Sequence, residues 1–232
     1  MRAALLLGGD LFPGPALSAA LAETQLVIAA DGGIRHAAPL GLTPDLWVGD
    51  FDSSSEDLLR RYPSVPREVH PRDKDATDAE LAARAALFRG ARELLWVGAF
   101  GAEADHALGH LGLALALADQ GVPVALTDGR TWGWPLVPPG RTIRLPPESR
   151  LSLVPWSELR GLTIEGARWE LDRANLPLGS TRALRNLARG PVRLGLADGR
   201  GIVLAWPAAS SGFSPFSLPP APRTPSTPPP PT

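Results

Sequence analysis

The chain has no cysteine and only one lysine, and both shortages narrow its chemistry. The lack of cysteine excludes disulfides, thiolate metal sites and thiol nucleophiles. Of the 23 basic residues 22 are arginine, which makes Lys74 stand out. A compact ammonium group meets a phosphate oxygen as a point charge, which a planar guanidinium does less well. Lys74 is therefore a candidate phosphate contact. The alternative is that this position is a lysine only by chance.

Long apolar runs and a strong net charge are also missing. The longest apolar stretch, residues 107–118, includes His110 and is too short to cross a bilayer. A formal charge of -1 and a pI near 6.4 provide no electrostatic footprint for nucleic acid or anionic lipid. The apolar run at the N-terminus ends in Gly8-Gly9-Asp10 and is typical of a first strand. We expect a cytoplasmic protein whose partners include neither nucleic acid nor a membrane.

Apolar runs typical of strands alternate with helical patterns over residues 1–130. This alternation predicts a Rossmann-like α/β domain, with a parallel sheet and helices on both faces. The expected strands are residues 3–7, 26–30, 46–48, 68–70, 94–97 and 122–126. The expected helices are residues 16–22, 34–40, 56–62, 77–88 and 105–119.

After residue 130 the pattern changes to short apolar runs separated by proline and glycine. It predicts a small antiparallel β-sandwich domain over residues 131–207, with strands at residues 142–145, 151–154, 162–165, 192–196 and 201–204. The Asp198-Gly199 pair between the last two runs predicts a β-hairpin. Residues 208–232 contain nine prolines and few core-forming side chains, so a disordered tail is expected there.

Acidic residues follow several of the expected strands. Asp50 and Asp52 come directly after the run Leu46-Trp47-Val48, and side chains two apart on an extended chain leave on the same face. The residues after parallel strands meet at one sheet edge, where open α/β sheets bind their ligands. The cluster expected there consists of Asp31, Asp50, Asp52, Asp78 and Asp105. Carboxylates gathered in this way repel one another unless cations lie among them, and their hard oxygen ligands suit Mg²⁺.

Each motif also has a purely structural interpretation. Gly32 and Gly33 after Asp31 either present backbone N–H groups to a phosphate or form an ordinary turn. Thr77-Asp78-Ala79-Glu80 fits a capping box, in which Thr77 caps the helix and Glu80 reaches back. Asp105 could cap the next helix, His106 is expected beside the site, and His110 is expected to be a core-edge histidine.

Three common catalytic signatures are absent from the sequence. There is no Gly-x-x-x-x-Gly-Lys-Ser/Thr segment, no Gly-x-Gly-x-x-Gly after the first expected strand and no Gly-x-Ser-x-Gly elbow. The remaining chemistry is phosphoryl transfer by carboxylate-held metal, one lysine and backbone amides.

Four motifs together resemble those of the thiamine pyrophosphokinase family in order and spacing. They are Ala30-Asp31-Gly32-Gly33, Gly49-Asp50-Phe51-Asp52-Ser53, Asp73-Lys74-Asp75-Ala76-Thr77-Asp78, and Gly98-Ala99-Phe100-Gly101 ahead of Asp105-His106. The resemblance covers residues 1–206. It implies an α/β domain followed by a β-sandwich, a homodimer, and Mg²⁺-dependent transfer of diphosphate from ATP to the hydroxyl of thiamine, giving thiamine diphosphate and AMP.

The resemblance also implies roles for single residues. Asp50 and Asp52 would bind the metal with Asp31 and Asp78, while Gly32, Gly33, Lys74 and Thr77 would meet ATP. Asp105 would lie near the thiamine hydroxyl as a base or orienting group. His106, Ser180 and Asn186 would contact the substrate.

The sequence departs from the family pattern both where a cation could hold phosphate and on the acceptor side. Ala102 and Glu103 stand where the family has glycine and arginine, and His110 stands where it has asparagine. In the second domain, Arg185-Asn186-Leu187 replaces Ser-Asn-Glu. These departures leave three alternatives open: a pyrophosphokinase with another hydroxymethyl heterocycle as acceptor, a non-catalytic thiamine- or nucleotide-binding member, and a metal phosphohydrolase.

Overall fold

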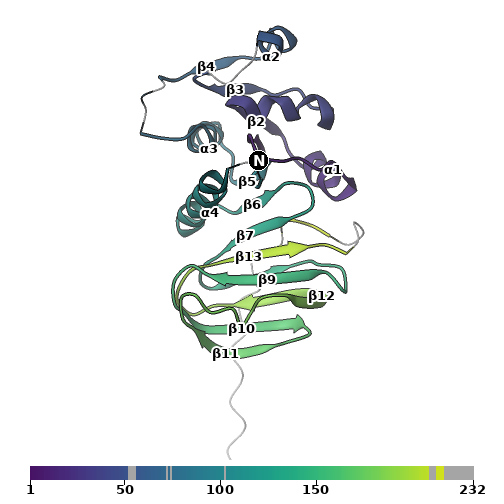
Figure 1. Ribbon diagram of the computed structural model, residues 1–232, viewed down its shortest axis with the longest axis vertical. Coiled ribbons are helices and arrows are strands. Elements are labelled where there is room, and N and C mark those ends of the chain that lie inside the picture. Colours follow the sequence, from purple (N-terminus) through teal and green to yellow (C-terminus); the bar gives the residue numbers. More distant parts are fainter. Residues whose placement is uncertain (52–55, 72, 74, 102, 209–212, 217–232) are drawn as a thin grey trace, which may run out of the picture.

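A computed structural model describes residues 1–51, 56–71, 73, 75–101, 103–208 and 213–216 of the 232-residue chain. The predictions made for Asp52, Lys74 and Ala102 therefore lie outside the described residues. Figure 1 shows one long, twisted succession of strands, with the helices gathered around its N-terminal half. Within the described part of the chain, no helix is long and apolar enough to cross a membrane.

The first half is a parallel sheet in the order β6-β5-β1-β2-β3-β4. Its strands are β1 (Arg2–Leu6), β2 (Leu26–Ala30), β3 (Leu46–Gly49), β4 (Arg67–Val69), β5 (Glu93–Val97) and β6 (Val124–Thr127). Its helices are α1 (Pro15–Ala22), α2 (Glu56–Arg61), α3 (Asp78–Phe88) and α4 (Ala104–Asp119). The predicted alternation of strands and helices is confirmed in this half.

Alternate residues of each central strand enter two different apolar clusters, because successive side chains on a strand point to opposite faces. Leu5 and Ile28 pack with the alanines of α3 and with α4 on one face. Leu6 and Ala29 pack with Leu17 of α1 on the other face. Figure 1 shows α3 and α4 on the opposite side of the sheet from α1.

The predicted helix over residues 34–40 is wrong in type. The chain forms two 3₁₀ helices there, η1 (Asp31–His36) and η2 (Ala38–Leu40). Pro39 has no backbone N–H and disfavours a helical residue before it, which interrupts a continuous α-helix. Gly41, in the left-handed conformation with φ of 65°, then ends the segment.

The second half consists of antiparallel strands. They are β7 (Trp132–Leu136), β8 (Gly140–Ile143), β9 (Arg150–Pro155), β10 (Leu159–Ala167), β11 (Leu171–Leu176), β12 (Asn186–Gly195) and β13 (Gly201–Trp206). The pairing of β6 with β7 joins the two halves, so one sheet crosses the predicted domain boundary at residue 130. A mixed α/β fold is confirmed, while the division into two domains and the sandwich arrangement stay predictions.

The predicted hairpin between the last two strands is wrong. β13 lies between β7 and β9, and β12 pairs with β8, β9 and β10. The Asp198-Gly199 segment instead pairs with Arg160, whose backbone N–H donates to the Asp198 carbonyl at 2.9 Å. Gly199 is needed for this crossing, because its φ is 104° and a Cβ would lie 2.1 Å from the Glu158 carbonyl oxygen.

Residues 213–216, inside the segment expected to be a disordered tail, contact the core. Phe213 packs edge-on against Trp132 with a ring-centroid distance of 4.7 Å, and the Trp134 indole donates to the Pro215 carbonyl at 2.7 Å. The Arg2 guanidinium lies over the Phe216 ring, with its central carbon 4.0 Å from the ring centroid. Residues 213–216 therefore anchor the chain on the core, while residues 209–212 and 217–232 lie outside the described residues, where disorder stays a prediction.

Candidate active site

The strand order places a crevice at the carboxyl ends of β1 and β5. Successive strands run outward from β1 through β4, and the chain then returns to place β5 on the other side of β1. Loops on the two sides of such a reversal diverge and leave room for a ligand. A pocket of about 280 Å³ lies there, lined by the ends of β1, β2 and β5 and the starts of α3 and α4. Its polar lining includes Asp31, Arg35, Thr77, Asp78, Glu103, His106 and His110.

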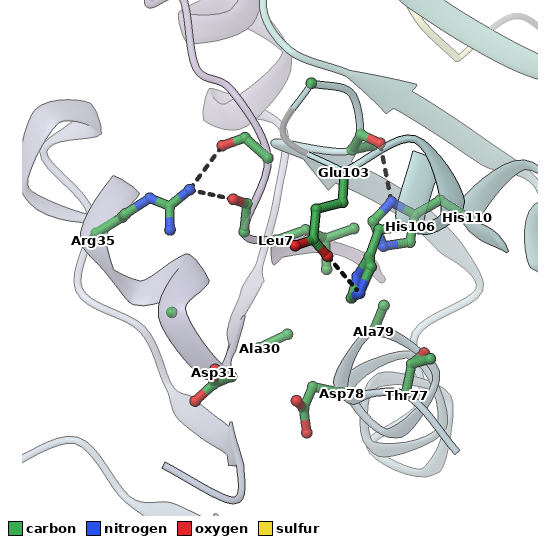
Figure 2. Close-up of a pocket in the computed structure, with 15 residues that line it drawn as sticks. Leu7, Ala30, Asp31, Arg35, Thr77, Asp78, Ala79, Glu103, His106 and His110 are labelled. Atoms are coloured by element: carbon green, nitrogen blue, oxygen red, sulfur yellow. Dashed lines mark hydrogen bonds and ion pairs between the residues drawn. The ribbon is translucent and has the colours of Figure 1, made fainter. Parts of the chain in front are cut away.

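Three of the predicted acids converge beside this pocket. Asp31 follows β2, Asp50 follows β3 and Asp78 begins α3, and all three are half-buried. One carboxylate oxygen from each lies within 4.8 Å of the others. Figure 2 shows Asp31 at the start of η1 and Asp78 at the start of α3, on the two sides of the same gap. Three hard oxygen donors at this spacing fit a divalent cation such as Mg²⁺.

Two unusual backbone conformations shape this cluster. Asp31 has φ of 40° and Phe51, next to Asp50, has φ of 63°, a region that non-glycine residues rarely adopt. Gly49 allows β3 to approach Asp31, since a Cβ there would lie 3.1 Å from the Asp31 Cβ. Gly33 leaves even less room for a side chain, because an added Cβ would lie 2.1 Å from the Leu6 carbonyl oxygen. Gly32 lines the pocket, whereas buried Gly33 lets η1 pack against β1.

The loop after β1 also lines the pocket, although its residues were not among the predicted site residues. One guanidinium nitrogen of Arg35 donates to the carbonyls of Gly8 and Gly9, the second at 3.1 Å. His36 donates from Nε2 to the same Gly9 carbonyl at 2.9 Å. Burial lowers the pKa of His36, which the hydrogen bond to Gly9 partly opposes. The glycine pair directly after the first strand was the available signal, because it lies at the same sheet edge as the acids.

Thr77 acts as the N-cap of α3, as predicted. Its hydroxyl accepts from the Glu80 backbone N–H at 3.3 Å. The Glu80 carboxylate does not complete a capping box, because it pairs with Arg84 one turn later at 2.5 Å. Thr77 also lines the pocket, so its hydroxyl has both a structural contact and access to a ligand.

The start of α4 forms a second, exposed group of Glu103, Asp105 and His106. The Glu103 carboxylate lies 3.5 Å from His106 Nε2, and Asp105 accepts from the His106 backbone N–H at 2.8 Å. Asp105 therefore lies apart from the three-acid cluster and lines a neighbouring pocket with Thr77 and His106. Glu103 and His106 also line the pocket at the ends of β1 and β5, where Figure 2 shows them side by side.

His110 is the buried histidine that was expected. Its Nδ1–H donates to the Ala99 carbonyl at 2.9 Å, and its ring packs edge-on against Trp96. Burial lowers the pKa of His110, which the hydrogen bond to Ala99 partly opposes. The ring is therefore neutral at pH 7 and presents one edge to the pocket.

Ser180 and Asn186 lie in the antiparallel half of the chain. Within one copy of the chain, neither residue lines the pocket beside the three acids. The Asn186 side chain is buried and bonds both backbone polar groups of Trp169, accepting at 3.0 Å and donating at 2.7 Å. It lines a separate pocket with Trp169, Arg182 and Arg185. The Ser180 hydroxyl accepts from the Arg182 backbone N–H at 3.4 Å, and one chain alone does not bring it to the acid cluster.

Comparisons with known proteins agree with the predicted resemblance. Residues 17–126 match the family described as thiamin pyrophosphokinase, catalytic domain. The thiamine pyrophosphokinase of Bacillus subtilis (strain 168) is 29% identical over 187 residues, covering 78% of this chain and 87% of that protein. A crystal structure of thiamine pyrophosphokinase from Bacillus subtilis has a TM-score of 0.80 and 25% identity, covering 90% of this chain and 100% of the other.

A more distant solved structure shows the same fold. The thiamin pyrophosphokinase of Geobacillus thermodenitrificans has a TM-score of 0.75 at 24% identity, covering 92% of this chain and 100% of the other. The matched residues 17–126 include Asp31, Asp50, Asp78 and Asp105, so the family match and the acid cluster concern the same part of the chain.

Proposed function

Because the resemblance of this chain to the thiamine pyrophosphokinase family is confirmed in sequence and in fold, we propose that it transfers diphosphate from ATP to the hydroxyl of thiamine. The products are thiamine diphosphate and AMP. The observation that carries the proposal is the convergence of Asp31, Asp50 and Asp78 at the crevice between β1 and β5.

The three carboxylates support a Mg²⁺ site, completed in the proposal by Asp52. When bound, Mg²⁺ supplies charge neutralisation for the phosphate oxygens and polarises the group under attack. The chain contributes the oxygen ligands, and two turns with positive φ orient them. Because the carboxylates are half-buried, their charges act more strongly than they would in water.

Around this cation the protein would hold the nucleotide mainly by backbone groups and cations. Gly32 and the loop at Gly8 and Gly9 line the pocket, and Lys74 is proposed to meet a phosphate. Arg35 places a guanidinium at the same crevice, anchored on the Gly8 and Gly9 carbonyls. Arg35 therefore offers a positive charge in a pocket where the family's arginine is replaced by Glu103.

Asp105 is proposed as the group that orients or deprotonates the acceptor hydroxyl. It is exposed at the first turn of α4, and it lines a pocket that shares Thr77 and His106 with the pocket at the ends of β1 and β5. His106 lines both pockets and would contact the substrate between the nucleotide and acceptor sides. A homodimer would allow Ser180 and Asn186 of the antiparallel half to approach this region from the partner chain. A cytoplasmic location remains part of the proposal.

A second candidate function is diphosphate transfer to another hydroxymethyl heterocycle. Glu103 favours it, because its carboxylate lines the pocket beside His106 and would attract a more cationic acceptor. The nucleotide and metal side of the site is the same in both candidates, so they differ only in the acceptor.

Product analysis tests the proposal. The purified protein is incubated with ATP, Mg²⁺ and thiamine, and the products are separated by chromatography. Thiamine diphosphate with equimolar AMP supports the proposal, and transfer only to other hydroxymethyl heterocycles supports the second candidate. Phosphate release without an acceptor would indicate a phosphohydrolase, and retained thiamine binding without product would indicate a non-catalytic member.

The role of Asp105 has its own test. Asp105→Asn keeps the size and removes the charge, so kcat is expected to fall about 100-fold if the carboxylate acts on the acceptor hydroxyl. Asp57→Asn, at an exposed position of α2, is the matched control and should stay within about twofold of the parent. An unchanged rate in Asp105→Asn would remove the residue from the proposed mechanism.

A further inference from the structure

Trp47 lies beneath the three-acid cluster and is completely buried on β3. It cannot touch a substrate, yet its indole N–H donates to the Asp31 carbonyl at 2.8 Å. Two other fully buried tryptophans, Trp96 and Trp132, have no hydrogen-bond partner for Nε1 among the described residues. A buried indole in this protein therefore does not always find a hydrogen-bond acceptor. The acceptor of the Trp47 indole is supplied by the turn that carries Asp31.

The Trp47 ring also contacts Phe51, the second residue of the site with positive φ. The Phe51 ring packs edge-on against the indole, with centroids 4.9 Å apart and planes at 75°. The Arg67 guanidinium lies over both rings, 5.3 Å from the Trp47 centroid and 5.9 Å from that of Phe51. Edge-on aromatic contacts and cations over rings are both stabilising.

One side chain thus contacts the two residues of this site whose φ is positive. Asp31 has φ of 40° and Phe51 has φ of 63°, and such conformations persist only where the surrounding structure holds them. The bond to the Asp31 carbonyl orients the turn that carries one carboxylate. The contact with Phe51 orients the turn that carries Asp50, directly before it in the chain.

We infer that Trp47 is a positioning residue for the cation site, which sets the separation of the Asp31 and Asp50 carboxylates without touching the ion. The inference rests on the proposed function, because it requires a divalent cation at Asp31, Asp50 and Asp78. Groups that orient metal ligands from behind typically change metal affinity about 10- to 100-fold when they are replaced.

Binding of Mn²⁺ in the absence of nucleotide and thiamine tests this role. Free Mn²⁺ is measured by electron paramagnetic resonance as the ion is titrated into the full chain. Trp47→Phe keeps an aromatic ring and removes the indole N–H, so we expect about tenfold weaker Mn²⁺ binding. Trp132→Phe is the matched control, because it also shortens a buried tryptophan but removes no indole hydrogen bond, and it should bind Mn²⁺ within about twofold of the parent.

A second variant, Arg67→Gln, keeps the test informative if Trp47→Phe does not fold. Arg67 is exposed at the surface, so Arg67→Gln leaves the core intact while removing the cation over both rings. We expect roughly two- to threefold weaker Mn²⁺ binding with an unchanged circular dichroism spectrum. If Mn²⁺ binds the parent but Trp47→Phe and Arg67→Gln bind it equally well, the inference is overturned and the cation site stands. A parent chain that does not bind Mn²⁺ would overturn both.

Discussion

Replacement of Gly33 by alanine is expected to damage both the fold and the site. A Cβ at this position would lie 2.1 Å from the Leu6 carbonyl oxygen, 2.6 Å from the Leu6 carbonyl carbon and 2.9 Å from the Leu7 carbonyl carbon. All three atoms belong to the backbone of β1 and its continuation, which is paired on both sides with β2 and β5. No flexible side chain can move aside, so η1 has to shift away from the sheet by roughly 1 Å.

The cost follows from two opposing contributions. Alanine restricts the unfolded chain and stabilises the fold by about 0.5–1 kcal/mol, whereas an overpacked contact costs about 1–3 kcal/mol and more when only backbone is available to move. With an overpacking cost of about 3 kcal/mol at this backbone contact, we expect a net loss near 2–2.5 kcal/mol, which lowers the melting temperature of a chain of this size by roughly 4–10 °C. Because Asp31 begins η1, its carboxylate moves with the turn, and Mn²⁺ binding should weaken as well.

Urea unfolding followed by circular dichroism measures the loss. Gly112→Ala is the matched control, because nothing lies within 4 Å of a Cβ there and the position is inside α4. Alanine replacing glycine inside a helix should stabilise the chain by about 0.5–1 kcal/mol. The reasoning is refuted if Gly33→Ala is as stable as the parent, or if the two substitutions change stability in the same direction.

Three further predictions concern other parts of the molecule. Because burial lowers the pKa values of His36 and His110, the unfolded chain takes up their protons first, so the free energy of unfolding should fall as the pH drops below about 6.5. Equal urea midpoints of the parent at pH 7.5 and 5.5 would contradict this, as would a pH dependence in His110→Gln as large as that of the parent. Phe213→Ala should cost about 2 kcal/mol in a thermal melt, since the half-buried ring packs on Trp132, and an unchanged melting temperature would show that the anchor adds nothing. Glu103→Arg should lower the KM for ATP several-fold by restoring a cation at the pocket, and an equal or higher KM in initial-rate kinetics would place the phosphates elsewhere.

The parallel half could be predicted because its signals are local. Buried runs such as Leu26–Ala30 and Leu46–Gly49 are apolar throughout, as expected for strands covered on both faces. The convergence of Asp31, Asp50 and Asp78 followed from one topological rule, that the carboxyl ends of parallel strands meet at one edge. Asp105 lies near that edge but groups with Glu103 and His106, because it belongs to the first turn of α4.

The antiparallel half was harder because its pairing is non-local. Strand β7 contains Pro135, which argues against a strand, but its ladder with β6 involves only Trp132 and Gly133, so the missing N–H breaks no bond on that side. The polar run of β11 gives little strand signal and pairs only with β10 in the described sheet. The Asp198-Gly199 pair predicted a local hairpin, but Asp198 forms a bridge with Arg160, and this tertiary pairing decides where the chain goes next.

Some parts of the site had no sequence signal at all. The contact between the Trp47 indole and the Asp31 carbonyl depends on the register of β2 against β3, which pairs Ala30 with Val48.

The C-terminal anchor, which lies outside the site, also had no sequence signal. Phe213 and Pro215 contact Trp132 and Trp134, about 80 residues earlier in the chain, and they belong to a proline-rich segment. Composition alone predicts disorder for such a segment, and only the tertiary structure shows the apolar surface that receives it.

The Mg²⁺ dependence of diphosphate transfer in Asp50→Asn tests the account most directly. The substitution keeps the side-chain size and removes one of the three converging charges, so we expect kcat/KM to fall on the order of 100-fold and the Mg²⁺ concentration at half-maximal rate to rise. Asp57→Asn, made in parallel, should behave like the parent chain. Formation of thiamine diphosphate by Asp50→Asn at the parent rate, with the parent Mg²⁺ dependence, would contradict the assignment of this acid cluster as the catalytic metal site.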